Sequence, residues 1–199
     1  MKHHALIALM LIGSHAQAAD ENFYLGVGWG GTNFKSKSVD INVPSSGSIP
    51  SVIDDSDANF RLYGGYRVNP NLAFEAVISD MGEWELVDDT NGFKATYEAS
   101  SVDLAVVGLL PLMGGDIDLF ARGGIAIWSL DTELEATTAP GTPTFVNAPV
   151  DSGEDLFWAA GINFNNLVDN WTFRTQLISY EISEFEELAQ FAFDFHYSF

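Results

Sequence analysis

The last stretch of the chain, Leu188 to Phe199, alternates between apolar and polar residues. The odd-numbered positions form a largely aromatic row: Ala189, Phe191, Phe193, Phe195, Tyr197 and Phe199. Because successive side chains of a strand point to opposite faces, this alternation predicts a β-strand with one aromatic face. A soluble sheet would bury that face, whereas a transmembrane β-barrel would turn it toward lipid and its polar face toward the lumen.

The first 18 residues have the pattern of an export signal. Lys2 supplies a positive start, residues 5–12 form a short apolar run, and Ala16-Gln17-Ala18 fits an A-x-A cleavage site. The run is much shorter than the ~20 apolar residues that a transmembrane helix requires. We therefore expect residues 1–18 to be cleaved and residues 19–199 to form one domain, with His196 as its single histidine.

Composition excludes several classes of protein. Eight Lys and Arg against 28 Asp and Glu give a net charge of −20, which argues against nucleic acid as a partner because phosphates must be met by cations. The chain has no cysteine, so neither disulfides nor thiol chemistry are available. A content of 47% hydrophobic residues separates it from disordered acidic chains.

Eight segments have strand character, and most have the ~9–11 residues that a tilted strand needs to cross the hydrocarbon core. They are residues 23–34, 58–68, 72–84, 95–110, 117–128, 155–164, 171–182 and 188–199. The connections alternate between long and short, which places both termini on the side of the short ones. The sequence therefore predicts an all-β, eight-stranded antiparallel up-and-down transmembrane barrel, with short periplasmic turns and long extracellular loops.

The two faces of these strands differ in the way that a barrel in a membrane requires. The inward candidates are mostly charged: Arg61, Arg67, Glu75, Asp103, Asp118, Arg122, Arg174, Asp194 and His196. Such residues make a poor dry core, as a lipocalin-like soluble barrel would need, and a plausible ion-paired lumen. We expect the arginines to meet the carboxylates across the interior, and Gly26, Gly28 and Gly30 to make room for large side chains opposite.

The outward candidates include Phe191, Phe193, Phe195, Leu104, Val106, Leu156 and Ile162, which we expect to contact lipid. Trp and Tyr prefer the membrane interfaces. The loop alternation predicts Trp171, Tyr197 and Phe199 at the short-turn end, and Trp84 and Tyr97 at the opposite end.

The whole chain after the export signal resembles the small eight-stranded outer-membrane barrels of the OmpA transmembrane-domain, OmpX and Ail type. The resemblance rests on YLGVGWG in the first strand, RLYGGYRV followed by NPN, and the terminal FDFHYSF. It implies the outer membrane of a Gram-negative bacterium, with lipid and lipopolysaccharide as surroundings. It also implies that the barrel-assembly machinery reads the C-terminal strand. Because the sequence stops at Phe199, where full-length OmpA continues into a peptidoglycan-binding domain, we expect no link to the cell wall.

No catalytic, cofactor-binding or metal-binding residues are predicted. His196 is expected near the periplasmic end, where it would serve as a hydrogen-bonding lumen residue and not as a base acting on outer-leaflet lipid. The acidic runs, Asp54, Asp55 and Asp57 or Asp131, Glu133 and Glu135, carry oxygen ligands suited to calcium but lack an EF-hand pattern.

We expect a barrel that anchors acidic extracellular loops for adhesion, another surface interaction or envelope integrity, with no enzymatic activity. The extracellular ligand, if the loops bind one, is not identified by the sequence. The alternatives are a lipid-modifying enzyme and a narrow pore, although eight strands leave an interior that side chains can fill.

Overall fold

The computed structural model describes residues 22–36, 39–43, 47–51, 54–88, 93–138, 142–147, 151–182 and 185–199, nearly all of them in strands. The expected export signal, residues 1–18, lies outside the described residues. Within the described ranges, no helix is long and apolar enough to cross a membrane.

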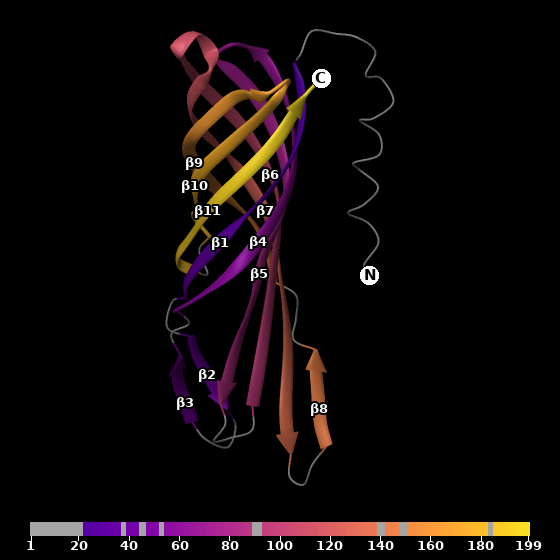
Figure 1. Ribbon diagram of the computed structural model, residues 1–199. Coiled ribbons are helices and arrows are strands. Elements are labelled where there is room, and N and C mark those ends of the chain that lie inside the picture. The colour runs from indigo at the N-terminus through magenta and orange to yellow at the C-terminus, as the bar shows by residue number, and fades with distance from the viewer. Residues whose placement is uncertain are drawn as a thin grey trace.

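Eight antiparallel strands close into a barrel (Figure 1). They are β1 (Phe23–Ser36), β4 (Asp54–Asn69), β5 (Leu72–Asp88), β6 (Phe93–Leu112), β7 (Ile117–Thr138), β9 (Asp151–Val168), β10 (Trp171–Tyr180) and β11 (Phe185–Ser198). Each strand pairs with its neighbours along the chain, and the seam joins the first strand to the last, with Tyr24 opposite Ser198. All eight predicted strands are present, and the predicted fold is confirmed.

The long connections differ from the sequence-based expectation, because much of their length is strand. Residues 35–57 contain a hairpin of β2 (Val39–Val43) and β3 (Gly47–Ser51). Most of residues 85–94 and 129–153 extends the barrel strands or forms β8 (Thr142–Asn147), which pairs with β7. Polar residues do not prevent this, since a strand outside lipid needs only a hydrogen-bonded neighbour. As a result, β5, β6 and β7 continue beyond the other barrel strands at the lower end of Figure 1, where β8 and the β2–β3 hairpin also lie.

The short connections are tight turns. The link from β6 to β7 contains the 3-10 turn η2 (Met113–Gly115), where Met113, Gly114 and Gly115 have φ of 51°, 77° and 104°. The link from β9 to β10 is shorter than predicted, because β9 continues to Val168 and leaves only a two-residue turn that ends at Asn170.

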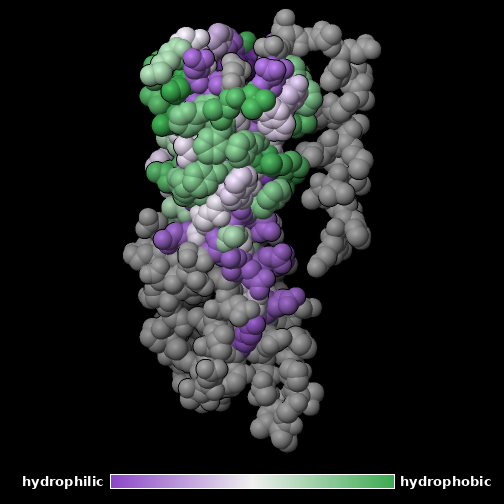
Figure 2. Space-filling view, viewed as in Figure 1, coloured by the Kyte–Doolittle hydropathy of each residue, from purple (hydrophilic) through white to green (hydrophobic). Residues whose placement is uncertain are grey.

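The strands have an apolar outer face and an inner face that combines polar and apolar residues. Figure 2 shows a band of hydrophobic residues across the visible face of the barrel, with hydrophilic residues above and below it. Leu156, Leu104, Val106 and Phe191 are 60%, 54%, 48% and 43% exposed, as predicted. The remaining outward candidates are half-buried: Phe193, Phe195 and Ile162. The two phenylalanines are partly covered by the neighbouring ring of Phe173, whose centroid lies 6.0 and 5.0 Å away.

Glycines in β1 leave space for side chains of the neighbouring strands to fold over them. A Cβ on Gly26 would lie 2.6 Å from a ring carbon of Tyr63 and 2.7 Å from His196 Cβ. A Cβ on Gly28 would collide with the carboxylate of Asp194. The inward-facing glycines therefore make room for large side chains, but these come from paired positions on the adjacent strands β4 and β11 and not from across the lumen, as was expected.

The predicted assignment of residues to the two ends is also correct. Trp171 lies opposite Tyr197 at the short-turn end, where the Phe199 amide donates to the carbonyl of Phe23. Trp84 lies opposite Tyr97 near the far end of the β5–β6 pair.

Candidate functional site

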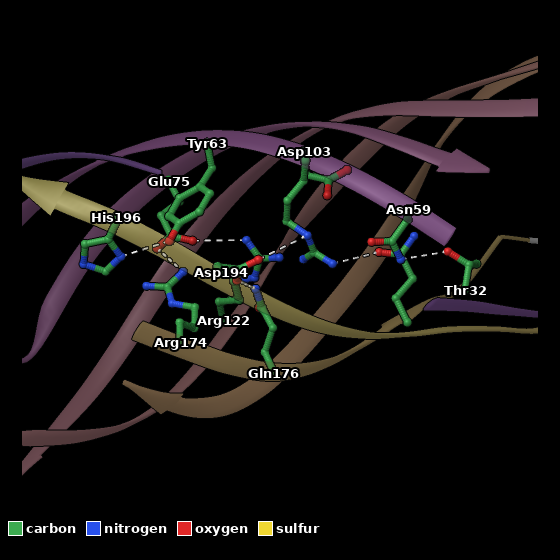
Figure 3. Close-up of polar contacts among 12 residues, drawn as sticks. Thr32, Asn59, Tyr63, Glu75, Asp103, Arg122, Arg174, Gln176, Asp194 and His196 are labelled. Carbon is green, nitrogen blue, oxygen red and sulfur yellow. Dashed lines mark hydrogen bonds and ion pairs between the residues drawn. The ribbon is translucent and has the colours of Figure 1, made fainter. Parts of the chain in front are cut away.

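The middle of the barrel is crossed by a buried network of ion pairs (Figure 3). Glu75 on β5 accepts from two cations, with Arg174 Nη1 at 2.8 Å and Arg122 Nη1 at 3.1 Å. Arg61 Nε lies 3.5 Å from Asp194 Oδ1 on β11. All five side chains are nearly excluded from solvent, and a buried charge is tolerated only when a partner compensates it. Together with Arg67, whose Nη2 lies 2.6 Å from Asp118, every predicted arginine has a predicted carboxylate partner.

Neutral groups that the sequence analysis did not single out complete the network. The Tyr24 hydroxyl donates to Glu75 at 2.7 Å, and Gln176 Nε2 donates to Asp194. Asp103 accepts from the hydroxyls of Ser101 and Tyr180, at 2.8 and 3.0 Å, so it is met by hydroxyls and not by an arginine. Alternation along each strand could have placed these residues on the inward face. It could not predict which of them meet, because pairing across the interior depends on the shear of the barrel, which periodicity does not encode.

Aromatic rings hold two of the guanidinium groups in place. Arg174 Cζ lies 4.6 Å from the ring centre of Phe120 and 5.2 Å from that of Tyr63. Arg122 Cζ lies 5.4 Å from the ring centre of Phe157. Cation–π contact adds attraction where solvent is excluded, so these rings and Glu75 fix the two cations between them.

The interior toward the long connections is apolar, which the expectation of a charged lumen did not anticipate. Buried side chains pack there into one cluster: Met81, Ala99, Ala105, Ala126, Trp128, Phe157, Ala159, Ile178, Tyr180, Ile182 and Leu188. Trp128 donates from Nε1 to Asp155 at 2.8 Å across the β7–β9 pair. An apolar layer thus fills the lumen on this side of the ion pairs, and a second buried cluster, which includes Ala73, Leu109 and Phe120, lies toward the short turns.

The side chains considered for catalysis and metal binding, His196 and Asp57, make hydrogen bonds within the protein. His196 Nδ1 lies 2.9 Å from the Tyr63 hydroxyl, and the ring centre lies 4.7 Å from that of Tyr24, near the short turns. The Asp57 carboxylate accepts the amides of Ala58 and Glu83, at 2.7 and 2.8 Å. Among the described side chains, no group of three or more His, Cys, Asp or Glu is arranged to hold a metal ion.

Of the remaining residues of the two acidic runs, only some have side chains among the described ones. Asp131 and Glu133 are exposed on β7. The side chains of Asp54, Asp55 and Glu135 lie outside the described ones.

Three carboxylates form a row on the outer face beyond the apolar band. The register places Glu83 opposite Glu98 and Glu98 opposite Asp131, on β5, β6 and β7, and all three are exposed. Like charges that face each other across strands repel. This row is an acidic rim, defined by Glu83, Glu98 and Asp131, and its charges are available to an external partner.

A polar cavity of about 160 Å³ occupies the short-turn end of the interior. Its deep wall carries the buried residues Tyr24, Arg174 and His196. Arg67, one-third exposed, lies at its mouth together with Ser198 and the polar residues of the β9–β10 turn region. The cavity is therefore closed on the side of the ion pairs and open to solvent at the turns.

Comparison with known proteins gives the same architecture. The model of the OmpA-like transmembrane domain family matches residues 18–181. Outer membrane protein A of Shigella flexneri is 27% identical over 161 residues, which cover 79% of this chain and 42% of that protein. The chain thus spans less than half the length of this curated relative.

Solved structures share the fold at low sequence identity. OprG of Pseudomonas aeruginosa is 12% identical with a TM-score of 0.57, covering 89% of this chain and 96% of its own. Ail of Yersinia pestis, solved in complex with the heparin analogue sucrose octasulfate, is 13% identical with a TM-score of 0.55, covering 89% and 99%.

Proposed function

The chain belongs to the family of OmpA-like transmembrane domains, and from this we propose that its barrel anchors a protruding acidic surface outside the cell. It is an outer-membrane β-barrel of the OmpA, Ail and OprG type, located in the outer membrane of a Gram-negative bacterium. The protruding surface serves adhesion, another surface interaction or envelope integrity, with the short turns in the periplasm.

The observation that carries this proposal is the unequal length of the strands. β6 and β7 have 20 and 22 residues, about twice the ~9–11 that a membrane crossing requires. The excess lies at one end and carries the acidic rim. The part of these strands beyond the apolar band forms a platform that anchoring in the membrane does not require. We infer that the platform presents the acidic rim to partners outside the cell.

The chemistry of the rim favours a cationic partner. Ail was solved with a polyanion, the heparin analogue sucrose octasulfate. Exposed carboxylates on three adjacent strands would repel such a ligand, and a chain of net charge −20 would add to the repulsion. The expected partner is a basic protein patch, or an anionic surface bridged by divalent cations such as lipopolysaccharide.

Assembly in the membrane adds two proposals about the ends of the sequence. Residues 1–18 act as a cleaved export signal, which leaves residues 19–199 as the barrel domain. The barrel-assembly machinery recognises β11, whose outward face is aromatic. N-terminal sequencing of the outer-membrane form tests the first proposal, with Ala19 as the expected first residue.

Catalysis and general solute flow are less well supported. The ring of His196 contacts Tyr63 and Tyr24 at the end away from the platform, and the described interior offers it no serine–acid arrangement. The ion pairs and the apolar cluster fill the cross-section of the barrel, which favours an anchor over a pore.

The test compares two double variants that remove the same charge from opposite ends. Glu98→Gln with Asp131→Asn neutralises the acidic rim, whereas Asp116→Asn with Asp169→Asn neutralises exposed positions in the short turns. Whole cells that display each form are assayed for binding to polylysine-coated surfaces and to epithelial cells. We expect a loss with the rim variant and none with the control. Equal binding by all forms would contradict the proposal.

A further inference from the structure

We propose that the short-turn cavity is a binding site for a small oxyanion, a carboxylate or a phosphate, that enters from the side of the short turns. The site is distinct from the acidic rim at the other end of the barrel. Its chemistry is opposite to that of the rest of the molecule, because cationic and neutral donor groups surround a space in a strongly acidic chain.

The charged groups that line the cavity are cations. Arg67 and Arg174 contribute guanidinium groups, and none of the described residues that form the wall is acidic. Their carboxylate partners, Asp118 and Glu75, lie behind the wall and are 1% and 4% exposed. An anion in the cavity would therefore contact hydrogen-bond donors directly and would be separated from the two carboxylates by the wall.

The guanidinium groups of the cavity wall differ in their access to solvent. Arg174 shares Glu75 with Arg122, and Arg67 pairs with Asp118. The Arg174 side chain is buried, whereas that of Arg67 is one-third exposed. An entering anion would therefore meet Arg67 first.

Arg174 is held in a fixed orientation at the inner wall of the cavity. Its Nη1 lies 2.8 Å from Glu75 Oε1, and the side chain is only 2% exposed. Its Nε donates to Asn163 at 2.9 Å, so the guanidinium is fixed in orientation. A guanidinium group that is already oriented can stabilise an oxyanion without further ordering of its side chain.

The neutral lining is held in place by hydrogen bonds within the wall. Asn165 Nδ2 donates to Asp118 and to the carbonyl of Gly115, both at 2.9 Å, which fixes the turn side of the wall. Thr172 donates to Asn165 Oδ1 at 3.2 Å. The volume of about 160 Å³ is similar to that of an engineered cavity of ~150 Å³ that accommodates benzene, so acetate or phosphate fits together with water.

The test is an NMR titration of the full refolded chain in detergent micelles with inorganic phosphate and, separately, with acetate. The reporter is the His196 ring, which lines the cavity. We expect saturable shifts of its Cε1–H signal with at least one of the two anions, and none with sodium chloride of equal ionic strength. Preference between the two anions identifies a phosphate or a carboxylate ligand.

Variants distinguish the cavity from general charge effects. Arg67→Gln removes the cation at the mouth, and Lys35→Gln, in the part of β1 toward the long connections, removes the same charge elsewhere. We expect Arg67→Gln to weaken binding about tenfold, the effect of losing one charge-assisted hydrogen bond, and Lys35→Gln to leave it unchanged. Ser198→Asp, which adds a carboxylate at the mouth without touching the ion pairs, should weaken binding similarly if Arg67→Gln fails to fold.

The proposal is overturned if neither anion produces a saturable shift, or if chloride produces the same one. Equal binding by the wild-type chain, Arg67→Gln and Ser198→Asp would also overturn it. None of these outcomes bears on the acidic rim, so the two proposals succeed or fail separately.

Discussion

At the scale of single residues, the packing of the interior depends on glycines, which leave space for the large side chains beside them. Gly28 lies beside the Arg61–Asp194 pair, and a Cβ there would come within 2.8 Å of Arg61 Cγ and collide with the Asp194 carboxylate. Gly31, three residues along the same strand, faces outward, and its Cβ would find its nearest heavy atom 4.0 Å away. The two glycines therefore form a matched pair.

We predict that Gly28→Ala lowers the free energy of unfolding by about 1–3 kcal/mol, since a close-packed interior must shift to accept the methyl group. Gly31→Ala should change it by less than about 0.5 kcal/mol, as is usual for unconstrained surface positions. Urea-induced unfolding from phospholipid vesicles measures both. A similar loss for the two variants would mean that the clash with the ion pair is not the cause.

At the scale of the strand, β5 contains a bulge just beyond the apolar band. The register with β6 shifts between Asp80 and Gly82. Met81 keeps the inward facing of Ser79 and joins the apolar cluster at 0% exposure, whereas Glu83, two residues on, faces outward. Gly82 has φ of 100° and donates from its amide to Asp80 Oδ1 at 3.0 Å. The bulge thus reverses the facing of the strand after Met81, at the point where the strand leaves the band.

Gly82→Ala should destabilise the protein by about 1–3 kcal/mol, because residues with a side chain rarely adopt this backbone conformation. Gly123→Ala is the control, since Gly123 has ordinary strand geometry and its Cβ would lie 3.6 Å from the nearest atom, the carbonyl oxygen of Phe157. The same unfolding assay applies, and an equal effect of the two substitutions would contradict the argument from φ.

How far the sequence predicts the structure also becomes clear at this scale. Period-two alternation was enough to place all eight strands and the facing of Leu104 and Phe191. It failed for the strands in the long connections, where water on both faces removes the alternation. It also could not foresee the outward facing of Glu83, since a bulge breaks the period after Met81, nor the cavity, which depends on shear across strands distant in sequence.

At the scale of the whole molecule, the apolar band defines how the barrel sits in the bilayer. Leu104 lies near the middle of the band on β6, whereas Leu112 ends the same strand beside the short turn. Leu104→Arg should cost about 2–4 kcal/mol and Leu112→Arg about 0–1, because the penalty for arginine falls from the midplane to the interface. Equilibrium folding into vesicles measures the difference. Equal penalties for the two substitutions would mean that Leu104 does not lie near the midplane of the bilayer.

Closure of the barrel also has a simple signature for the intact protein. We expect the refolded chain to migrate faster on an SDS gel before boiling than after it, because a closed sheet has no free edge at which detergent unfolding can begin. Identical migration before and after boiling would contradict a closed barrel.

The seam between β1 and β11 has a further consequence, which concerns the order of events during folding. It joins Tyr24 to Ser198, positions that lie almost a full chain length apart. Contacts of such separation carry the largest loop-closure entropy and form slowly, whereas each hairpin joins near neighbours. The hairpins can therefore form early, but the last step must wait until β11 has been exported. Until that moment the chain is an open sheet with two free edges, and the seam is the step that a folding catalyst would accelerate most.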